Sequence, residues 1–186
     1  MIKNKQDLRE YIQSDNEWLL EVSIKDKLIA GYANYPYRYI SKFLKYLRKQ
    51  EFYINTTDGS KLGWMKSLYY ERKKNKLGTR LGIEIAPNCF GKGLNVYHIG
   101  SIIINPNVRA GEGCSLHGAN CIGNNGLTDS VPRLGNRVDV GYGAVIIGDV
   151  EIADDVKIGA NAVVNKSVLE PGCTVVGIPA KIVKHK

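Results

Sequence analysis

The chain contains 186 residues, of which 44% are hydrophobic, and it carries a net charge of +8. This length suits about one ordinary domain with a sizeable core, and the hydrophobic content excludes global disorder. No apolar run approaches the roughly 18 residues needed to span a bilayer, and residues 1–10 are too polar for the apolar stretch of a signal peptide. We therefore expect a cytoplasmic protein.

The excess positive charge lies entirely in the first part of the chain. Residues 1–81 hold 17 basic and 9 acidic residues, a net charge of +8, whereas residues 82–186 hold 9 of each. A basic, tyrosine-rich region suits nucleic acid, an anionic membrane or simple packing with solvated lysines. Because no nucleic-acid motif accompanies the charge, we favour a packing module and expect no nucleic-acid partner. Weak association with the inner face of a membrane is the alternative that stays open.

Residues 1–81 are expected to form an α-helical region. The spacing at Ser14-Asp15-Asn16-Glu17 is that of a capping box, which predicts a helix start before an apolar segment that includes Trp18 and Leu19 and stops near Gly31. A second helix is expected to begin near Pro36, whose fixed φ suits a first helical turn. A third is expected over residues 61–76.

Residues 82–186 contain a six-residue repeat. Stepping by six from Leu134 reaches an aliphatic residue at seven of eight positions. A period of six matches neither a simple strand nor an α-helix, but it is produced by a parallel β-helix, in which three hexapeptides close one triangular coil. The aliphatic residue points inward and glycine, asparagine and aspartate supply the corners. The eight positions are Leu134, Val140, Ile146, Ile152, Ile158, Val164, Glu170 and Val176.

The repeat defines a second domain over residues 82–186. With a loop at residues 123–133 set aside, its length corresponds to roughly five coils of about 18 residues each. The predicted fold class is therefore mainly β, a parallel β-helix preceded by the α-helical region of residues 1–81. Four cysteines without C-x-x-C spacing are expected to be small buried hydrophobic residues rather than disulfides or ligands: Cys89, Cys114, Cys121 and Cys173.

The hexapeptides, the closing segment over residues 176–183 and the histidine in Tyr97-His98 resemble, in this order, the left-handed β-helix acyltransferases. Within them the chain is most similar to the serine acetyltransferase-like branch, which includes sugar and polysaccharide O-acetyltransferases. The resemblance implies a left-handed β-helix, acetyl-CoA as co-substrate, no metal, and a homotrimer with active sites between neighbouring prisms.

Acyl transfer to a hydroxyl needs a base that takes the hydroxyl proton and returns a proton to the leaving thiolate, and imidazole suits both steps. The resemblance places the base at His98 and an orienting carboxylate at Glu84. His117 lies about one coil after His98, so it could be the base itself or bind the acceptor. The sequence leaves this choice open.

Acceptor binding is assigned to Tyr97, His117, Asn120 and Arg133. Serine acetyltransferases carry an Arg-His pair before the proline that follows the loop, whereas this chain has Ser130-Val131-Pro132-Arg133 there. Tyr97 also replaces the acidic residue expected before the catalytic histidine. Both departures argue against free serine as the acceptor of the acetyl group. An aromatic ring beside the base suits stacking on a sugar acceptor.

Coenzyme A is expected to lie along side-chain-poor corners of the β-helix. Glycines at these corners are equally explained by the backbone geometry of a corner, so their assignment to coenzyme A depends on the resemblance. The resemblance also makes Lys181 and the tail lysines Lys184 and Lys186 candidates for binding the nucleotide phosphates. The assigned residues are Gly123, Gly141, Tyr142, Gly143, Gly159, Ala160 and Lys181.

The sequence thus predicts an O-acetyltransferase that moves acetyl from acetyl-CoA to a hydroxyl of a sugar or polysaccharide precursor. Serine O-acetyltransferase of cysteine biosynthesis is the closest alternative. A zinc hydratase on the same helix would need three histidine ligands, and this chain has two internal histidines. A non-catalytic β-helix scaffold is the remaining alternative.

Overall fold

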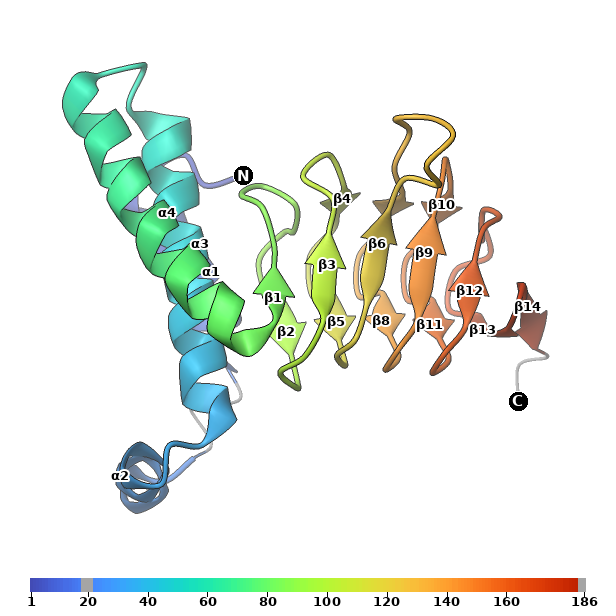
Figure 1. Ribbon diagram of the computed structural model, residues 1–186, viewed down its shortest axis with the longest axis horizontal. Helices are drawn as coiled ribbons and strands as arrows, with labels where there is room; N and C mark the ends of the chain where they lie inside the picture. The colour runs from blue at the N-terminus through green and yellow to red at the C-terminus, as the bar shows by residue number, and fades with distance from the viewer. Residues whose placement is uncertain (18–21, 184–186) are drawn as a thin grey trace.

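A computed structural model describes residues 1–17 and 22–183 (Figure 1). It consists of a group of helices at one end and a triangular prism of short strands that extends away from them. Trp18 and Leu19 of the predicted apolar segment, and the tail residues Lys184 and Lys186, lie outside the described residues.

The helices are α1 (Lys5–Ser14), α2 (Ile24–Tyr32), α3 (Pro36–Thr56) and α4 (Lys61–Leu81). The predicted starts at Pro36 and near residue 61 are confirmed. The predicted start at Ser14 is wrong, because Ser14 is the last residue of α1 and the cap of that helix is Asn4, whose side chain accepts from two backbone N–H groups. No helix within the described residues is long and apolar enough to cross a bilayer.

The prism has three faces, and each is a sheet. Apart from the last pair, the strands of each sheet are parallel. Face A contains β1 (Ile83–Glu84), β3 (Ile102–Ile104), β6 (Cys121–Gly123), β9 (Val145–Ile147) and β12 (Val163–Val164). Face B contains β4 (Arg109–Ala110), β7 (Arg133–Leu134) and β10 (Glu151–Ile152). Face C contains β2 (Asn95–Val96), β5 (Ser115–Leu116), β8 (Asp139–Val140), β11 (Lys157–Ile158), β13 (Thr174–Gly177) and β14 (Ala180–Val183).

Single bridges from Phe90 and Val168 extend face B at its two ends, so residues 83–175 make five coils. The predicted left-handed parallel β-helix of about five coils, preceded by helices, is confirmed. The last strand, β14, pairs antiparallel with β13 and ends the prism.

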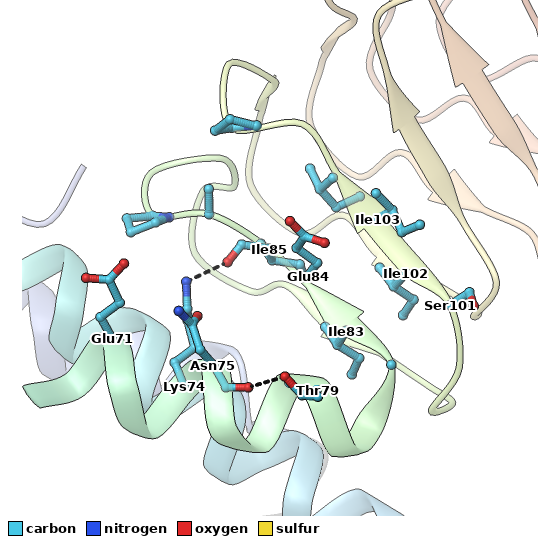
Figure 2. Close-up of a pocket in the computed structure, with 16 residues that line it drawn as sticks. Glu71, Lys74, Asn75, Thr79, Ile83, Glu84, Ile85, Ser101, Ile102 and Ile103 are labelled. Atoms are coloured by element: carbon cyan, nitrogen blue, oxygen red, sulfur yellow. Dashed lines mark hydrogen bonds between the residues drawn. The ribbon is translucent and has the colours of Figure 1, made fainter. Parts of the chain in front are cut away.

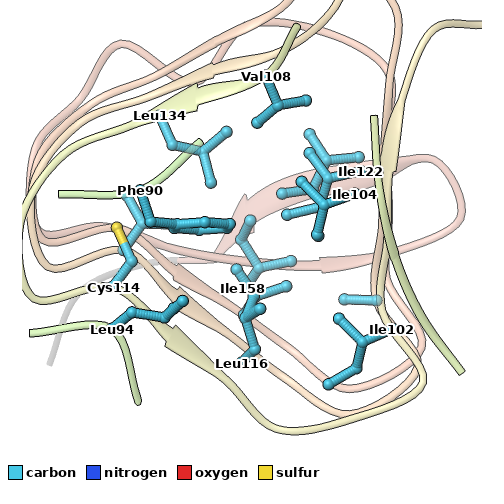
Figure 3. Close-up of a cluster of buried hydrophobic side chains, with 14 of the residues drawn as sticks. Phe90, Leu94, Ile102, Ile104, Val108, Cys114, Leu116, Ile122, Leu134 and Ile158 are labelled. Atoms are coloured by element: carbon cyan, nitrogen blue, oxygen red, sulfur yellow. The ribbon is translucent and has the colours of Figure 1, made fainter. Parts of the chain in front are cut away.

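The core of the prism is the predicted column of aliphatic side chains. Figure 3 shows these side chains converging from all three faces onto the axis of the prism. Leu116, Ile122 and Ile146 are completely buried, and burying an aliphatic side chain of this size contributes about 1.5–3 kcal/mol. Repeated through five coils, this burial is the main source of stability for the β-helix.

The loop after β6 does not disturb the repeat. Ile122 pairs with Ile146, 24 residues later, whereas Ile146 pairs with Val164, 18 residues later. The coil that contains the loop is therefore six residues longer, which is the length of one hexapeptide. The aliphatic positions on either side of the loop consequently keep the same phase.

A buried ion network joins the helices to the first coil. The Arg48 guanidinium, on α3, donates to the carboxylate of Asp15 at 2.7 Å and to that of Glu51 at 2.9 Å. It also donates to the carbonyl oxygens of Phe90 and Gly91 at 2.9 and 2.6 Å. Burial alone disfavours the charged guanidinium, but the carboxylates of Glu51 and Asp15 outweigh it and hold the pKa of Arg48 above its ordinary value.

The Asp15 carboxylate continues the network into the prism. It follows α1 directly, is 1% exposed, and accepts hydrogen bonds from the backbone N–H groups of Gly93 and Leu94 at 2.9 Å each. Through Asp15 and Arg48, backbone groups at the open end of the first coil are satisfied by side chains of the helical region.

Candidate functional site

The turns that lead from face C to face A stack along one edge of the prism, here called the C–A ridge. They comprise residues 97–101 after β2, 117–120 after β5, 141–144 after β8 and 159–162 after β11. The parallel register of faces A and C places each turn beside the next. The ridge therefore collects most of the predicted site residues: Tyr97, His98, His117, Gly141, Tyr142, Gly143, Gly159 and Ala160.

His117 has the most defined surroundings on the C–A ridge. Its Nε2 lies 2.7 Å from Oδ1 of Asp139, and the two side chains are 37% and 42% exposed. On its other side the imidazole packs against the ring of Tyr97, with centroids 4.6 Å apart and ring planes 32° apart. The pair is thus held from two coils and is open to solvent.

His98 is exposed at the first turn of the C–A ridge. A Cβ placed on Gly118 would lie 3.4 Å from the Cβ of His98 and 3.2 Å from Cε2 of Tyr142. Gly118 therefore leaves room for His98 and Tyr142 to flank the turn that carries His117. The register between the two coils places Tyr97 beside His117 and His98 beside Gly118.

Glu84 is exposed on β1 of face A, where it pairs with Ile103 of β3. Among residues 1–17 and 22–183, no hydrogen bond or ion pair joins Glu84 to His98. The predicted orienting pair is therefore not assembled within this chain, and Glu84 faces a cleft instead.

That cleft, of about 600 Å³, lies between α4 and face A (Figure 2). It narrows where Gly78 approaches β1, and Glu71 and Glu84 occupy opposite walls. At its base the buried ammonium of Lys74 donates to the carbonyl oxygen of Ile85 at 3.0 Å. Burial lowers the pKa of Lys74, because the cation is removed from water.

Three predicted site residues do not present their side chains beside the histidines. Asn120 is completely buried, and its side chain accepts from Gly118 N and donates to Gly141 O, so it fixes the turn from inside the prism. Gly123 and Arg133 border the long loop between faces A and B, at the opposite edge of face A from the C–A ridge. A single chain does not bring them to His98 or His117.

Apart from Gly123, the residues assigned to coenzyme A form a line that leads to the C-terminal hairpin. Gly141 and Gly159 follow β8 and β11, and a Cβ on Gly159 would lie 2.7 Å from Val176 Cγ1. Val176 in turn pairs with Lys181 of β14. The cationic side chain of Lys181 therefore lies at the end of the row of glycine-containing corners. This placement suits coenzyme A, whose narrow pantetheine arm ends in phosphate groups.

Asp139 is the site residue that the sequence analysis missed. It precedes the aliphatic position Val140 and lies 22 residues after His117. The phase of the repeat could have indicated this residue, because it makes the side chain at position 139 point outward on the coil that follows His117. The six additional residues of that coil hid this proximity, since a standard coil has about 18 residues.

No family model matches the chain. Among curated proteins, it is 41% identical over 105 residues to a serine acetyltransferase of Helicobacter pylori strain 26695, covering 55% of this chain and 61% of that protein. It is 31% identical over 105 residues to the serine acetyltransferase of Mycobacterium tuberculosis H37Rv, covering 55% of this chain and 45% of that protein. The chain thus spans less than two thirds of the length of these relatives.

Solved structures share the fold. Soybean serine acetyltransferase matches with a TM-score of 0.71 at 22% identity, covering 96% of this chain and 70% of that chain. Serine acetyltransferase from Brucella abortus strain S19 matches with a TM-score of 0.69 at 20% identity, covering 96% and 68%. A serine acetyltransferase in complex with CoA matches with a TM-score of 0.72 at 20% identity, covering 96% and 71%. The likeness therefore includes the helices as well as the prism.

Proposed function

We propose that this chain is an acetyl-CoA-dependent O-acetyltransferase of the serine acetyltransferase branch of hexapeptide-repeat acyltransferases. The observation that carries the proposal is the C–A ridge, where two imidazoles lie on neighbouring turns and one of them is hydrogen-bonded to a carboxylate. The two relatives described above, at 41% and 31% identity, are named serine acetyltransferases and support the same chemistry.

The ridge supplies the proton transfers that acetyl transfer requires. An imidazole that takes the hydroxyl proton as oxygen attacks the thioester carbonyl becomes an imidazolium, which then protonates the departing thiolate. A nearby carboxylate stabilises that imidazolium. The neighbouring corners, with Lys181 at their far end, are the proposed place for coenzyme A.

L-Serine is the acceptor that the comparisons favour, since the named relatives are serine acetyltransferases. The saccharide hydroxyl expected from the sequence is a second candidate. It is favoured by the exposed rings of Tyr97 and Tyr142, each more than half exposed on the C–A ridge, which offer surfaces for stacking on a sugar. Arg133 belongs to this proposal only if the loop of a neighbouring copy reaches the ridge, as in the homotrimer that the resemblance implies.

Thiol release from acetyl-CoA tests the proposal. The purified chain is incubated with acetyl-CoA and with L-serine, a panel of saccharides or no acceptor, and a double variant His98→Ala/His117→Ala is the control. We expect acceptor-dependent release with L-serine that the double variant loses. Turnover with a saccharide and none with L-serine would support the second candidate. Absence of turnover with every acceptor, together with no thermal shift on adding coenzyme A, would favour a non-catalytic scaffold.

A further inference from the structure

Large apolar side chains lie on the solvent-facing side of α4. Five of them, within residues 62–69, are between 46% and 63% exposed. The positions that α4 buries are instead Gly63, Lys74, Gly78 and Leu81. A surface helix ordinarily turns its apolar side inward, so these side chains form the kind of exposed patch that marks an interaction surface. They are Leu62, Trp64, Met65, Leu68 and Tyr69.

The same side of α4 becomes basic toward its C-terminal half. Helical spacing of three and four residues carries the row from Met65 and Leu68 to Arg72 and Lys76, which are both exposed. Six of the seven basic residues of α4 are exposed, whereas its one acidic residue lines the cleft beside face A. The five apolar residues together with Arg72, Lys73 and Lys76 are here called the α4 outer face.

Two lysines bring positive charge next to tyrosine rings. Lys73 Nζ lies 5.1 Å from the centroid of the Tyr69 ring, and Lys66 Nζ lies 5.5 Å from that of Tyr53 on α3. Such a lysine lays its methylene groups along apolar surface while its ammonium keeps its charge at the edge. The apolar and the cationic groups are therefore adjacent, and a partner of the α4 outer face has to suit both.

We propose that the α4 outer face binds a membrane surface rich in anionic lipid. The apolar side chains enter the boundary between headgroups and acyl chains, and the cations face the lipid phosphates. Tryptophan, tyrosine and leucine beside lysine and arginine are the side chains with which helices lie in that boundary. Residues 1–81 carry a net charge of +8 and residues 82–186 carry none, so the attraction acts on the helical end of the molecule. The inference goes beyond the proposed function and does not depend on it.

A second copy of this chain is a poorer occupant of the α4 outer face. In a symmetric contact the same surface of both copies meets, so Arg72, Lys73 and Lys76 of one copy would lie near the same cations of the other. Glu71, the acidic residue of α4, lines the cleft instead of this face (Figure 2). Like charges brought together oppose such a contact, whereas lipid phosphates carry the opposite charge.

Vesicle sedimentation with the full chain tests the proposal. The probes are vesicles of phosphatidylcholine alone and vesicles of equal parts phosphatidylcholine and phosphatidylglycerol. We expect the chain to sediment mainly with the anionic vesicles, and raising the salt from about 0.1 M to about 1 M should weaken binding several-fold, because salt shortens the range of the attraction. Absence of sedimentation, or equal sedimentation with both kinds of vesicle, would overturn the proposal.

A triple variant that removes cations tests whether α4 makes the contact. Arg72→Gln/Lys73→Gln/Lys76→Gln should weaken binding to the anionic vesicles by roughly 100-fold, since each cation near such a surface contributes about fivefold. All three side chains are exposed, so the midpoint of thermal unfolding should stay that of the wild type.

The matched control removes the same charge from the prism. Lys92→Gln/Lys157→Gln/Lys166→Gln should weaken vesicle binding less than about tenfold, because these lysines lie on the prism and not on α4. Equal losses from the two triple variants would mean that net charge alone governs binding, and would contradict a site on α4.

A second triple variant removes apolar side chains and keeps the charge. Leu62→Ser/Met65→Ser/Leu68→Ser should weaken binding by more than about tenfold, because the apolar area that enters the lipid is lost. The mass of the chain in solution, measured by light scattering, should not change. A lower mass together with unchanged vesicle binding would show that the α4 outer face joins two copies, and would overturn the proposal.

Trp64 reports whether the α4 outer face enters the lipid. The chain has two tryptophans, so Trp18→Phe leaves Trp64 as the single fluorescent indole. Lipids brominated on their acyl chains should quench its fluorescence in anionic vesicles, since the ring then lies at the boundary with the acyl chains. An unquenched Trp64 in the vesicle-bound chain would place the contact elsewhere and refute the proposal.

Discussion

The thiols of Cys89 and Cys114 lie inside the prism. Each is about 1% exposed, and the Cys114 sulfur lies 3.4 Å from the carbonyl oxygen of Gly135. Burial raises the pKa of both thiols to about 11, because the thiolate is poorly solvated there. The expectation of buried, unpaired cysteines is confirmed for these two and for Cys173, whereas Cys121 is partly exposed on face A.

These differences predict the order in which the cysteines react. At pH 8, far below a pKa of about 11, only about one in a thousand of the buried thiols is ionised at any moment, and the thiolate is the reactive form. Alkylation of the native protein with iodoacetamide should therefore modify Cys121 first, as read by mass spectrometry of peptides. Cys89 and Cys114 should react only after denaturation. Equal rates for all of these thiols in the native protein would contradict the described burial.

The sequence predicted the histidines of the site but not their partners. His117 and Tyr97 could be found because histidines are few and lie beside recognisable repeat positions. The contact of His117 with Asp139 depends on the register between coils, and the longer coil obscured it. The pairing of Glu84 with His98 was expected from resemblance alone, and the two lie unpaired in the single chain.

At the scale of elements, the joint between α4 and β1 depends on a close approach. Gly78 lies in the last turn of α4, and a Cβ there would lie 2.4 Å from the carbonyl oxygen of Ile83. The helix then ends at Gly82, which has a positive φ of 68° and is suited to a helix C-terminus. Glycine at position 78 therefore sets how closely the helix approaches the first strand.

Gly78→Ala should destabilise the protein. Alanine favours a helix over glycine by about 1 kcal/mol, but the clash is with backbone and forces α4 away from β1, at a cost of roughly 1–3 kcal/mol beyond that gain. The free energy of unfolding from urea denaturation measures the effect. Lys76→Ala, at an exposed position of α4, is the control and should be close to wild type. A stabilised Gly78→Ala would mean that the helix does not approach β1 so closely.

Most elements followed from local patterns. The hexapeptide phase located the strands, since each aliphatic position marks a side chain that must point inward. The starts of α3 and α4 had local signals in Pro36 and in the apolar spacing after residue 61. The helix α1 was missed because the capping-box pattern at Ser14 suggested a helix start, whereas Ser14 ends a helix capped by Asn4, and Asp15 of that pattern accepts a hydrogen bond from the first coil instead.

At the scale of the whole molecule, Arg48 couples the helices to the prism. The charge is fully buried among two carboxylates and two carbonyl oxygens. Removal of one partner from such a group leaves unpaired buried charges, which costs about 3–5 kcal/mol.

Arg48→Ala should therefore lower the free energy of unfolding by about 3–5 kcal/mol, measured by urea denaturation. Circular dichroism should show helical signal lost before the β-helix unfolds, because the helical region is released from coil 1. Arg137→Ala is the matched control: Arg137 also contacts two carboxylates, Asp154 and Asp155, but on the surface, so its loss should be barely detectable. Similar effects of the two variants would refute a coupling role for Arg48.

The two ends of the prism also bear on solubility. A β-helix presents unpaired backbone groups at its first and last coils, and such edges can template the addition of further strands without limit. Here the side chains of Asp15 and Arg48 form hydrogen bonds with backbone groups of the first coil. At the last coil, β14 pairs antiparallel with β13 (Figure 1). The hydrogen-bonded side chains at one end and the antiparallel strand beside β13 at the other leave fewer backbone groups free to pair with a second copy, which disfavours growth into a fibre.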